Sequence, residues 1–216
     1  MTAPHTYTLH YSPSTASLAV HWMLLEIGAP FELVRVDFDA KEQKSAAYLR
    51  LNPTGLVPTL IVDGKPFGEC AALLMLLAER HPDKSFAPLS GTPERAAYFQ
   101  WMFYLANTLQ PAFRAWFYPD EPAGEARIEE AKAHARAKIE ACFDRIDAHL
   151  ARSPFLAGTS LSGADFLLTM LTRWSRNMPR PATSWPHLAK YVSERRAMPM
   201  LREVHRREEL TDWING

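Results

Sequence analysis

The sequence has only two cysteines in 216 residues, Cys70 and Cys142, so it lacks the framework of a disulfide-stabilised secreted domain. It contains no Cys-x-x-Cys pair, which disfavours a dithiol redox site. It also has no His-x-x-x-His pair and no cysteine spacing of the kind that binds metal. We therefore expect no bound metal, and we expect a reducing, cytoplasmic setting for the protein.

An excess of charge of either sign is also absent, because 24 Lys and Arg residues balance 24 Asp and Glu residues. This balance argues against binding to nucleic acid or to a membrane surface through bulk charge. No apolar run approaches the length of a membrane span, and the first five residues have neither the basic nor the apolar region of a signal peptide. The hydrophobic share of 47% is ordinary for a globular protein of one large or two small domains.

What is present is a change of pattern along the chain. Short apolar runs predict strands at residues 6–11, 31–36, 59–62 and 66–67, and helical spacing predicts helices at 16–27, 41–51 and 70–80. Asp63-Gly64 is a strong hairpin signal between the last two strands. The order βαβ, α, ββα predicts a thioredoxin-like α/β domain over residues 1–82.

Strand signals vanish after a stretch containing proline, glycine and serine, residues 83–91, which we interpret as a linker. Residues 92–216 are predicted to form an all-α domain, with helices at about 92–118, 125–150, from 163, 187–196 and 200–208. Pro111 predicts a kink or bend in the first of these. Ser162 and Asp165 have the spacing of a capping box at the start of the third.

The segment 52–60 is the most informative for function, because Val57-Pro58 stands at the mouth of an apolar strand. A cis bond there would turn the backbone of Val57 outward, where it could pair with an extended peptide. Glu69 then opens a helix and could meet the charged end of such a ligand. The alternative is a plain loop with a trans proline, which is the commoner state of X-Pro bonds.

In their order and spacing, these segments resemble the glutathione transferase superfamily, bacterial beta-class-like members above all. The resemblance rests on residues 52–60, Glu69-Cys70 and the stretch 162–165, together with 11–18 after the first strand, and it covers nearly the whole chain. It implies a cytoplasmic, homodimeric detoxification enzyme that uses glutathione as co-substrate. The reaction it implies is attack of the glutathione thiolate on a small hydrophobic electrophile.

The family's chemistry takes place at the first strand-to-helix turn, where a hydroxyl or thiol stabilises the glutathione thiolate. The resemblance offers Thr15, Ser14 and Ser17 as catalytic candidates, with Thr15 and Ser14 ahead of Ser17. Helix capping is the alternative role for each of these hydroxyls. Ala16 occupies the position where the beta class usually has a cysteine, so mixed-disulfide chemistry is not expected here.

Glutathione-binding residues are also implied by the resemblance: Val57, Pro58, Glu69, Cys70, Lys41 and Gln110. Glu69 would pair with the γ-glutamyl ammonium, and the N–H of Cys70 would receive the carboxylate. A reactive Cys70 is the alternative to a small packing residue, since a helix N-terminus lowers the pKa of a thiol. Lys41 has the alternative of a solvated surface residue.

Aromatic residues would form the wall of the electrophile site, and Arg114 would stabilise negative charge that develops on the substrate. The candidates are Tyr11, Phe113, Arg114, Phe117 and Trp174. An apolar pocket with a few polar groups suits a hydrophobic electrophile. A core or subunit-interface role is the alternative for the aromatic residues, and a surface ion pair is the alternative for Arg114. Tyr11 has a further alternative as the thiol activator.

Two other functions stay open on the same fold, because a fold does not decide a reaction. The first is glutathione-dependent dehalogenation, isomerisation or peroxide reduction. The second is a largely non-catalytic glutathione-binding or interaction module, which Ala16 and Cys70 both favour.

Overall fold

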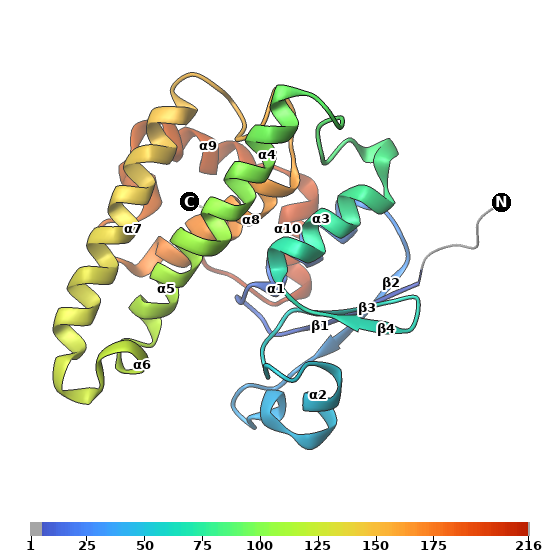
Figure 1. Cartoon of the computed structure of the whole chain (residues 1–216), viewed down its shortest axis with the longest axis horizontal. Coiled ribbons are helices and arrows are strands. Elements are labelled where there is room, and N and C mark those ends of the chain that lie inside the picture. Colours follow the sequence, from blue (N-terminus) through green and yellow to red (C-terminus); the bar gives the residue numbers. More distant parts are fainter. Residues whose placement is uncertain (1–5, 216) are drawn as a thin grey trace. The chain divides into compact units, whose positions relative to one another are not determined.

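The computed structural model describes residues 6–215 and divides into two compact units. The first unit contains the residues up to Ser85 and those from Arg196 onward, and the second contains Phe86–Arg195. The first break lies inside the stretch 83–91 that we interpreted as a linker. The thioredoxin-like α/β unit and the helical unit are both present as the sequence predicted (Figure 1).

A four-stranded sheet forms the centre of the first unit. Its strands are β1 (Tyr7–Tyr11), β2 (Phe31–Arg35), β3 (Thr59–Val62) and β4 (Lys65–Phe67), in the order β2-β1-β3-β4. β1 pairs parallel to β2 and antiparallel to β3, with Leu9 opposite Leu33 on one side and Leu60 on the other. At the predicted hairpin, Asp63 and Gly64 both have positive φ, 49° and 82°, as a tight two-residue turn requires.

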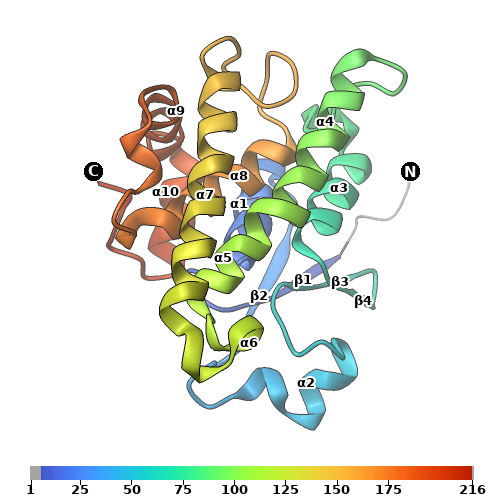
Figure 2. The same cartoon turned by 60° about the vertical axis from the view of Figure 1, so that its left-hand side comes forward.

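Helices cover both faces of this sheet. α1 (Ser17–Ile27), α3 (Cys70–Arg80) and α10 (Pro199–Arg207) lie on one face, and the short α2 (Ala46–Leu51) lies on the other (Figures 1 and 2). α1 is apolar on nearly every side and almost wholly buried, because it packs against α3 and α10 as well as β1. It ends at Gly28, whose φ of 73° is a left-handed conformation that glycine adopts without steric cost.

The C-terminal segment belongs to the first unit, whereas we had expected residues 92–216 to form one helical domain. The physical reason is the packing of α10 on α1, which covers apolar surface of α1 that the sheet and α3 leave open. Periodicity within the last helix predicts its existence and its apolar face. It carries no information about which of two distant partners covers that face.

The second unit is all-helical. Its helices are α4 (Pro93–Tyr104), α5 (Gln110–Phe117), α6 (Asp120–Ala123), α7 (Ile128–Leu150), α8 (Gly163–Trp174) and α9 (Pro186–Arg196). α5 packs along the long α7 and α4 packs on α8, an arrangement visible in Figure 2. Every residue of α8 except Trp174 is buried, so this helix is the core of the unit.

Two of the predicted helix starts have the expected caps. Thr92 accepts the N–H of Arg95 at 3.2 Å, with Pro93 at the first helical position. Ser162 and Asp165 form the capping box, in which the Asp165 carboxylate accepts the Ser162 N–H at 2.9 Å. The expected bend at Pro111 takes the form of a π-helical turn, Leu105–Leu109, between α4 and α5. This wider turn accommodates the residue that cannot donate a backbone hydrogen bond.

Candidate functional site

The turn between β1 and α1 contains a compact network of hydroxyl groups. The Ser12 carbonyl accepts the Thr15 hydroxyl at 2.7 Å and the Ser17 hydroxyl at 3.2 Å. The Thr15 and Ser17 oxygens are themselves 2.8 Å apart. Three hydroxyl contacts share only two hydroxyl hydrogens, one from Thr15 and one from Ser17. Ser17 can therefore donate to the Thr15 oxygen while the Thr15 hydroxyl hydrogen points away from the Ser12 carbonyl.

Exposure separates the three catalytic candidates. Ser17 is fully buried, whereas Thr15 and Ser14 are half-buried. Ser14 has a φ of 66°, a conformation that a residue with a side chain seldom adopts, and its N–H donates to Glu208 at 3.1 Å. Thr15 therefore combines access from solvent with support from a second hydroxyl, and Ser17 is placed to act through Thr15.

Tyr11 ends β1 beside this turn and is largely buried. Burial, followed by the charge of Glu208, raises the pKa of its phenol, so the group stays protonated around neutral pH. Its ring lies 5.9 Å from that of His21, centroid to centroid. This position suits either of the two roles that we considered for Tyr11.

The Val57-Pro58 peptide bond is cis. Val57 is half-buried and precedes β3, so its backbone lies outside the register that pairs β3 with β1 and β4. This is the backbone that the sequence offered for pairing with an extended ligand.

The loop before Val57 is held by Asn52, whose role in this site the sequence did not indicate. The buried Asn52 side chain donates to the Leu56 carbonyl and to the Thr59 hydroxyl, each at 3.0 Å. Its oxygen accepts the Thr54 N–H at 3.2 Å and the Thr54 hydroxyl at 2.7 Å. One amide thus ties together a whole loop, and the Tyr48 hydroxyl supports it by donating to the Leu56 carbonyl at 2.8 Å.

Glu69 and Cys70 stand at the start of α3. Glu69 is exposed, with a φ of 64°, and its carboxylate makes no hydrogen bond or ion pair within the described residues. Cys70 is buried, and its thiol donates to the Ala16 carbonyl at 3.3 Å. Burial, followed by the charge of Glu69, raises the pKa of the Cys70 thiol to about 12, which disfavours the reactive alternative for this residue.

Two further candidates, Lys41 and Gln110, belong to other elements. Lys41 is exposed, with a φ of 54°, before a short 3₁₀ turn. The neighbouring Lys44 is the lysine that holds the loop after α2, donating to the Gly55 carbonyl at 3.1 Å. Gln110 belongs to the second unit, where it is half-buried as the first residue of α5.

Aromatic rings gather around the end of α5 in the second unit. Phe113 is fully buried, with its centroid 5.8 Å from that of Trp174 and 6.1 Å from that of Phe117. Phe117 is exposed and lies 6.0 Å from Trp174. Phe113 is therefore a core residue, whereas Phe117 presents its ring to solvent.

Arg114 is engaged within its own unit. Its guanidinium forms a two-pronged ion pair with Glu121 and lies 4.3 Å from the centroid of the Tyr118 ring. This matches the surface ion pair that we considered as its alternative role.

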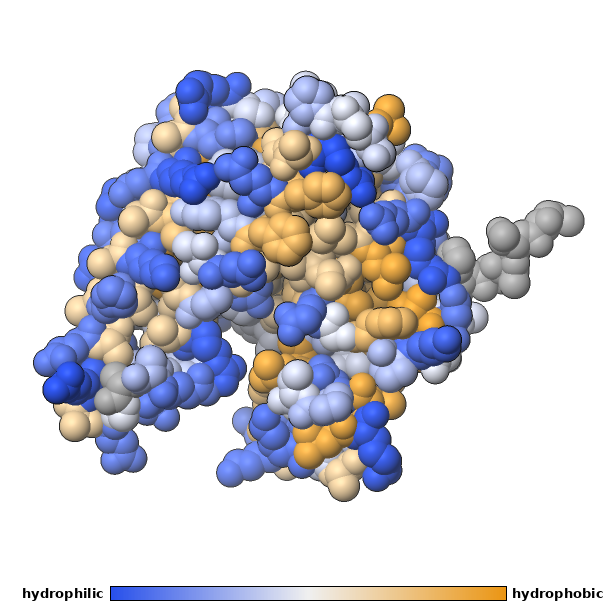
Figure 3. All heavy atoms as spheres, viewed as in Figure 1, coloured by the Kyte–Doolittle hydropathy of each residue, from blue (hydrophilic) through white to orange (hydrophobic). Residues whose placement is uncertain are grey.

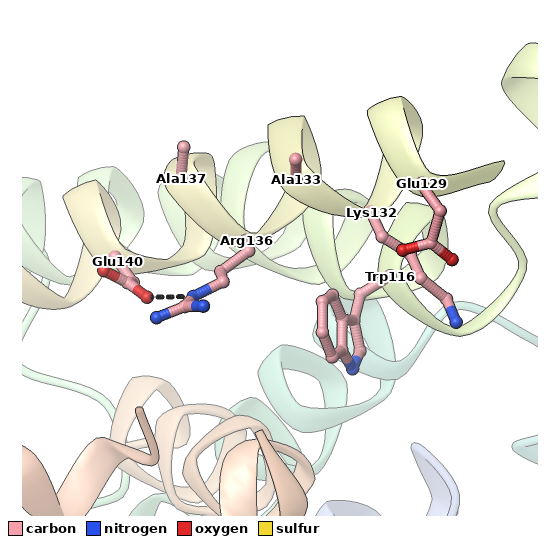
Figure 4. A pocket seen from close by; sticks show the side chains of 7 residues that line it. All are labelled: Trp116, Glu129, Lys132, Ala133, Arg136, Ala137 and Glu140. Carbon is pink, nitrogen blue, oxygen red and sulfur yellow. Dashed lines mark hydrogen bonds and ion pairs between the residues drawn. The ribbon is translucent and has the colours of Figure 1, made fainter. Parts of the chain in front are cut away.

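A separate hollow of about 430 Å³ lies on the second unit, between Trp116 of α5 and the face of α7 from Glu129 to Glu140 (Figure 4). Arg136 donates to Glu140 at 2.6 Å across its edge. None of the predicted site residues lines it.

Among residues 6–215, no three His, Cys, Asp or Glu side chains are grouped so that they could hold a metal ion. Within the same residues, no helix has the length and apolar character needed to cross a membrane.

Comparison with known proteins identifies the family of this chain. Residues 5–79 match the model of the glutathione S-transferase N-terminal domain, and residues 129–194 match that of the C-terminal domain. Glutathione S-transferase GST-4.5 of Xanthomonas campestris is 36% identical over 171 residues, which are 77% of this chain and 81% of the relative. Glutathione S-transferase GstA of Escherichia coli O157:H7 is 29% identical over 91% of this chain and 96% of its own.

Solved structures agree with this assignment. A sphingomonad glutathione S-transferase complexed with glutathione has 30% sequence identity and a TM-score of 0.83, covering 94% of this chain and 100% of its own. The bacterial beta class enzyme of Sphingomonas chungbukensis has 29% identity and the same TM-score, again over 94% and 100%. The chain therefore belongs to the glutathione S-transferase family.

Proposed function

We propose that this chain is a glutathione S-transferase in which the Thr15 hydroxyl activates the thiol of glutathione. The observation that carries the proposal is the paired network of Thr15 and Ser17 at the N-terminus of α1. Ser17 donates to Thr15, and Thr15 in turn donates to the sulfur. A hydrogen bond to the charged form stabilises the thiolate and lowers the thiol pKa. The positive end of the α1 dipole acts in the same direction.

The glutathione backbone is held at three places in this proposal. Val57 pairs its N–H and carbonyl with the peptide, and Pro58 fixes the path of the chain behind it. The free, exposed carboxylate of Glu69 receives the γ-glutamyl ammonium, and the N–H of Cys70 receives the neighbouring carboxylate. Lys41 and Gln110 contribute polar contacts at the edges of the ligand.

The reaction forms one bond and breaks one. The thiolate electron pair makes a new carbon–sulfur bond to the electrophile, and the leaving group departs with the electrons of the bond that breaks. Holding both reactants together supplies much of the rate, since it removes the entropic cost of a bimolecular encounter. For the electrophile we propose contact with Tyr11 and with the aromatic residues Phe117 and Trp174, backed by the buried Phe113. Arg114 would have to leave Glu121 to take part.

Substitutions in the turn test the assignment. Thr15→Val keeps the shape and removes the hydroxyl, whereas Thr15→Ser keeps the hydroxyl. Conjugation of glutathione to a chlorodinitrobenzene-type electrophile should fall about tenfold or more in Thr15→Val, because a thiol pKa higher by one unit leaves about a tenth of the thiolate. Thr15→Ser should keep most of the activity. Ser17→Ala should lose less, and Ser14→Ala least.

The outcome that sinks this assignment is a Thr15→Val enzyme with full turnover and an unchanged pKa of the bound thiol. Retention of the wild-type protein on immobilised glutathione without turnover of any electrophile would instead favour the non-catalytic binding module. One observation favours that second candidate. Both hydroxyl hydrogens of Thr15 and Ser17 already have acceptors inside the turn.

We further propose a homodimer in the cytoplasm. Exposed apolar side chains support the first part: Leu56 and Phe67 of the first unit, and Phe103 of the second, are each more than 40% exposed. Figure 3 shows hydrophobic patches among the hydrophilic side chains of one face of the molecule, and exposed hydrophobic patches mark interaction surfaces. Two free, buried cysteines accord with a reducing compartment. Light scattering that returns the chain mass of 24.5 kDa would contradict the dimer.

A further inference from the structure

A buried carboxylate from the far end of the chain lies against the candidate catalytic turn. Glu208 follows the last residue of α10, and its side chain is fully buried. Two costs attend this position. Removing a carboxylate from water is expensive, and the carbonyl end of a helix repels negative charge. Such a group needs strong partners inside the first unit.

Glu208 has two partners, and they lie on either side of the start of α1. One oxygen accepts the backbone N–H of Ser14 at 3.1 Å. The other meets His21 Nδ1 at 2.9 Å, and His21 is fully buried as well. His21 Nε2 has no partner among the described residues, so the tautomer that has its hydrogen on Nδ1 satisfies this contact.

The charges around Glu208 are engaged elsewhere. Arg206 and Arg207 both donate to Glu203 at 2.7 Å, and the Arg207 guanidinium also lies over the ring of Phe31. No Lys or Arg among the described residues forms an ion pair with Glu208. Its carboxylate is therefore available entirely to the turn and to α1.

Ser14 needs such an anchor, because its φ of 66° is disfavoured for a residue with a side chain. Fixing the Ser14 N–H fixes the next residue, Thr15, whose hydroxyl must point at a ligand rather than at the Ser12 carbonyl. We propose that Glu208 is a positioning residue for glutathione thiol activation, tying the Ser14–Thr15 turn to His21 on α1. This inference rests on the proposed function and adds a residue from the C-terminal segment to it.

Two conservative substitutions separate the reach of the side chain from its charge. Glu208→Asp keeps the charge but shortens the side chain by about 1.5 Å, so it cannot span both partners. Glu208→Gln keeps the reach and loses the charge: its oxygen accepts the Ser14 N–H, and its amide donates to Nδ1 of the other tautomer of His21. That tautomer has its hydrogen on the partnerless Nε2, so this variant should be less stable while it keeps the turn in place. Glu209→Asp is the matched control, since Glu209 is the adjacent, exposed acid.

Three measurements on the full chain decide the proposal. They are the pKa of bound glutathione from thiolate absorbance, the split of kcat against KM, and hydrogen exchange at the Ser14 amide. Glu208→Asp should raise the bound-thiol pKa by about one unit and lower kcat about tenfold at a pH below that pKa. It should also speed exchange at Ser14. Glu208→Gln should stay within about threefold of wild type on all three, and Glu209→Asp should match wild type.

The reverse pattern would overturn the proposal. An unchanged Glu208→Asp enzyme together with a lowered thiol pKa in Glu208→Gln would mean that Glu208 acts only through its charge. If Glu208→Asp does not fold, the Glu208→Gln enzyme decides: a bound-thiol pKa that falls, as loss of a negative charge alone predicts, overturns the proposal, and a wild-type pKa together with wild-type exchange at the Ser14 amide supports it. Hydrogen exchange at the Ser14 amide reports whether the turn is held in place, and it does so without any catalytic turnover. A wild-type protein that binds glutathione but forms no thiolate would therefore refute the proposed function separately.

Discussion

Cys70 shows at the scale of one residue how packing overrides a sequence signal. A thiol at a helix N-terminus has a lowered pKa when solvent reaches it. Here the thiol is enclosed and donates to the Ala16 carbonyl, so the starts of α1 and α3 are joined by a neutral hydrogen bond. The chemical difference between these outcomes can be measured directly.

Burial and the charge of Glu69 raise the pKa of the Cys70 thiol to about 12, so the group remains neutral between pH 7 and 9. Iodoacetamide should therefore modify native protein at Cys70 only slowly throughout this range, and quickly after unfolding in denaturant. Mass spectrometry of the peptide that contains Cys70 makes the comparison. Rapid native modification that rises tenfold per pH unit from pH 7 to 8 and is lost in Cys70→Ala would contradict the buried, neutral thiol.

Asn52 offers a second test at this scale. Asn52→Ala removes the amide that joins Thr54, Leu56 and Thr59, together with its hydrogen bonds to them, at a cost of about 1–3 kcal/mol. The loop before Val57 should then loosen, so KM for glutathione should rise severalfold while kcat at saturation changes less. Asn177→Ala at an exposed position is the control. An unchanged KM in a folded Asn52→Ala protein would remove Asn52 from the site.

The sequence indicated more of the fold than of the site, and particular residues show why. The hairpin at Asp63-Gly64 and the box at Ser162 depend on neighbours in the chain, so local chemistry predicts them. The contact of Glu208 with Ser14 spans 194 positions. Glu208 is one of four consecutive charged residues, Arg206-Arg207-Glu208-Glu209, and such a run predicts a solvent-exposed segment. Helical spacing puts Glu208 on the face of Leu201 and Val204, but nothing in the sequence identifies Ser14 and His21 as the partners that such a buried acid meets.

At the scale of elements, α4 and α8 approach each other at Gly163, the first residue of α8, which has no side chain. A Cβ placed on Gly163 would come within 2.6 Å of the Tyr98 hydroxyl oxygen, closer than real contacts allow. Glycine at the first residue of α8 therefore permits the close approach of α4.

Gly163→Ala should push these two helices apart and destabilise the protein by about 1–3 kcal/mol. Tyr98→Phe removes the hydroxyl oxygen that the new methyl group would meet. The double variant should therefore recover part of the lost free energy of unfolding. Denaturant unfolding of the four proteins gives the coupling energy between the two positions. Strict additivity would show that the Tyr98 hydroxyl is not the limiting contact.

At the scale of the whole molecule, the two units differ in continuity. The helical unit is one stretch of chain, whereas the thioredoxin-like unit is assembled from both ends. A chain ending at Arg195 lacks α10 and Glu208. Exposed apolar surface on α1 should then weaken its unit, and hydrogen exchange in β1 and α1 should become fast while α8 stays protected.

A chain shortened only by its last two residues is the control for this truncation. Equal protection of α1 in the truncated and full chains would contradict the packing role of α10. Loss of protection throughout both units would show instead that the two unfold as one.

The discontinuous unit has a consequence for synthesis. Its strands and α1 leave the ribosome first, but the segment that carries Glu208 leaves only after the 110 residues from Phe86 to Arg195. At about 5–20 residues per second, this interval lasts roughly 5 to 20 s. During that time α1 has no cover from α10 and Ser14 has no acceptor from Glu208. The nascent chain should therefore form the anchored Ser14–Thr15 turn, and with it the activated thiol, only after the segment that carries Glu208 has emerged.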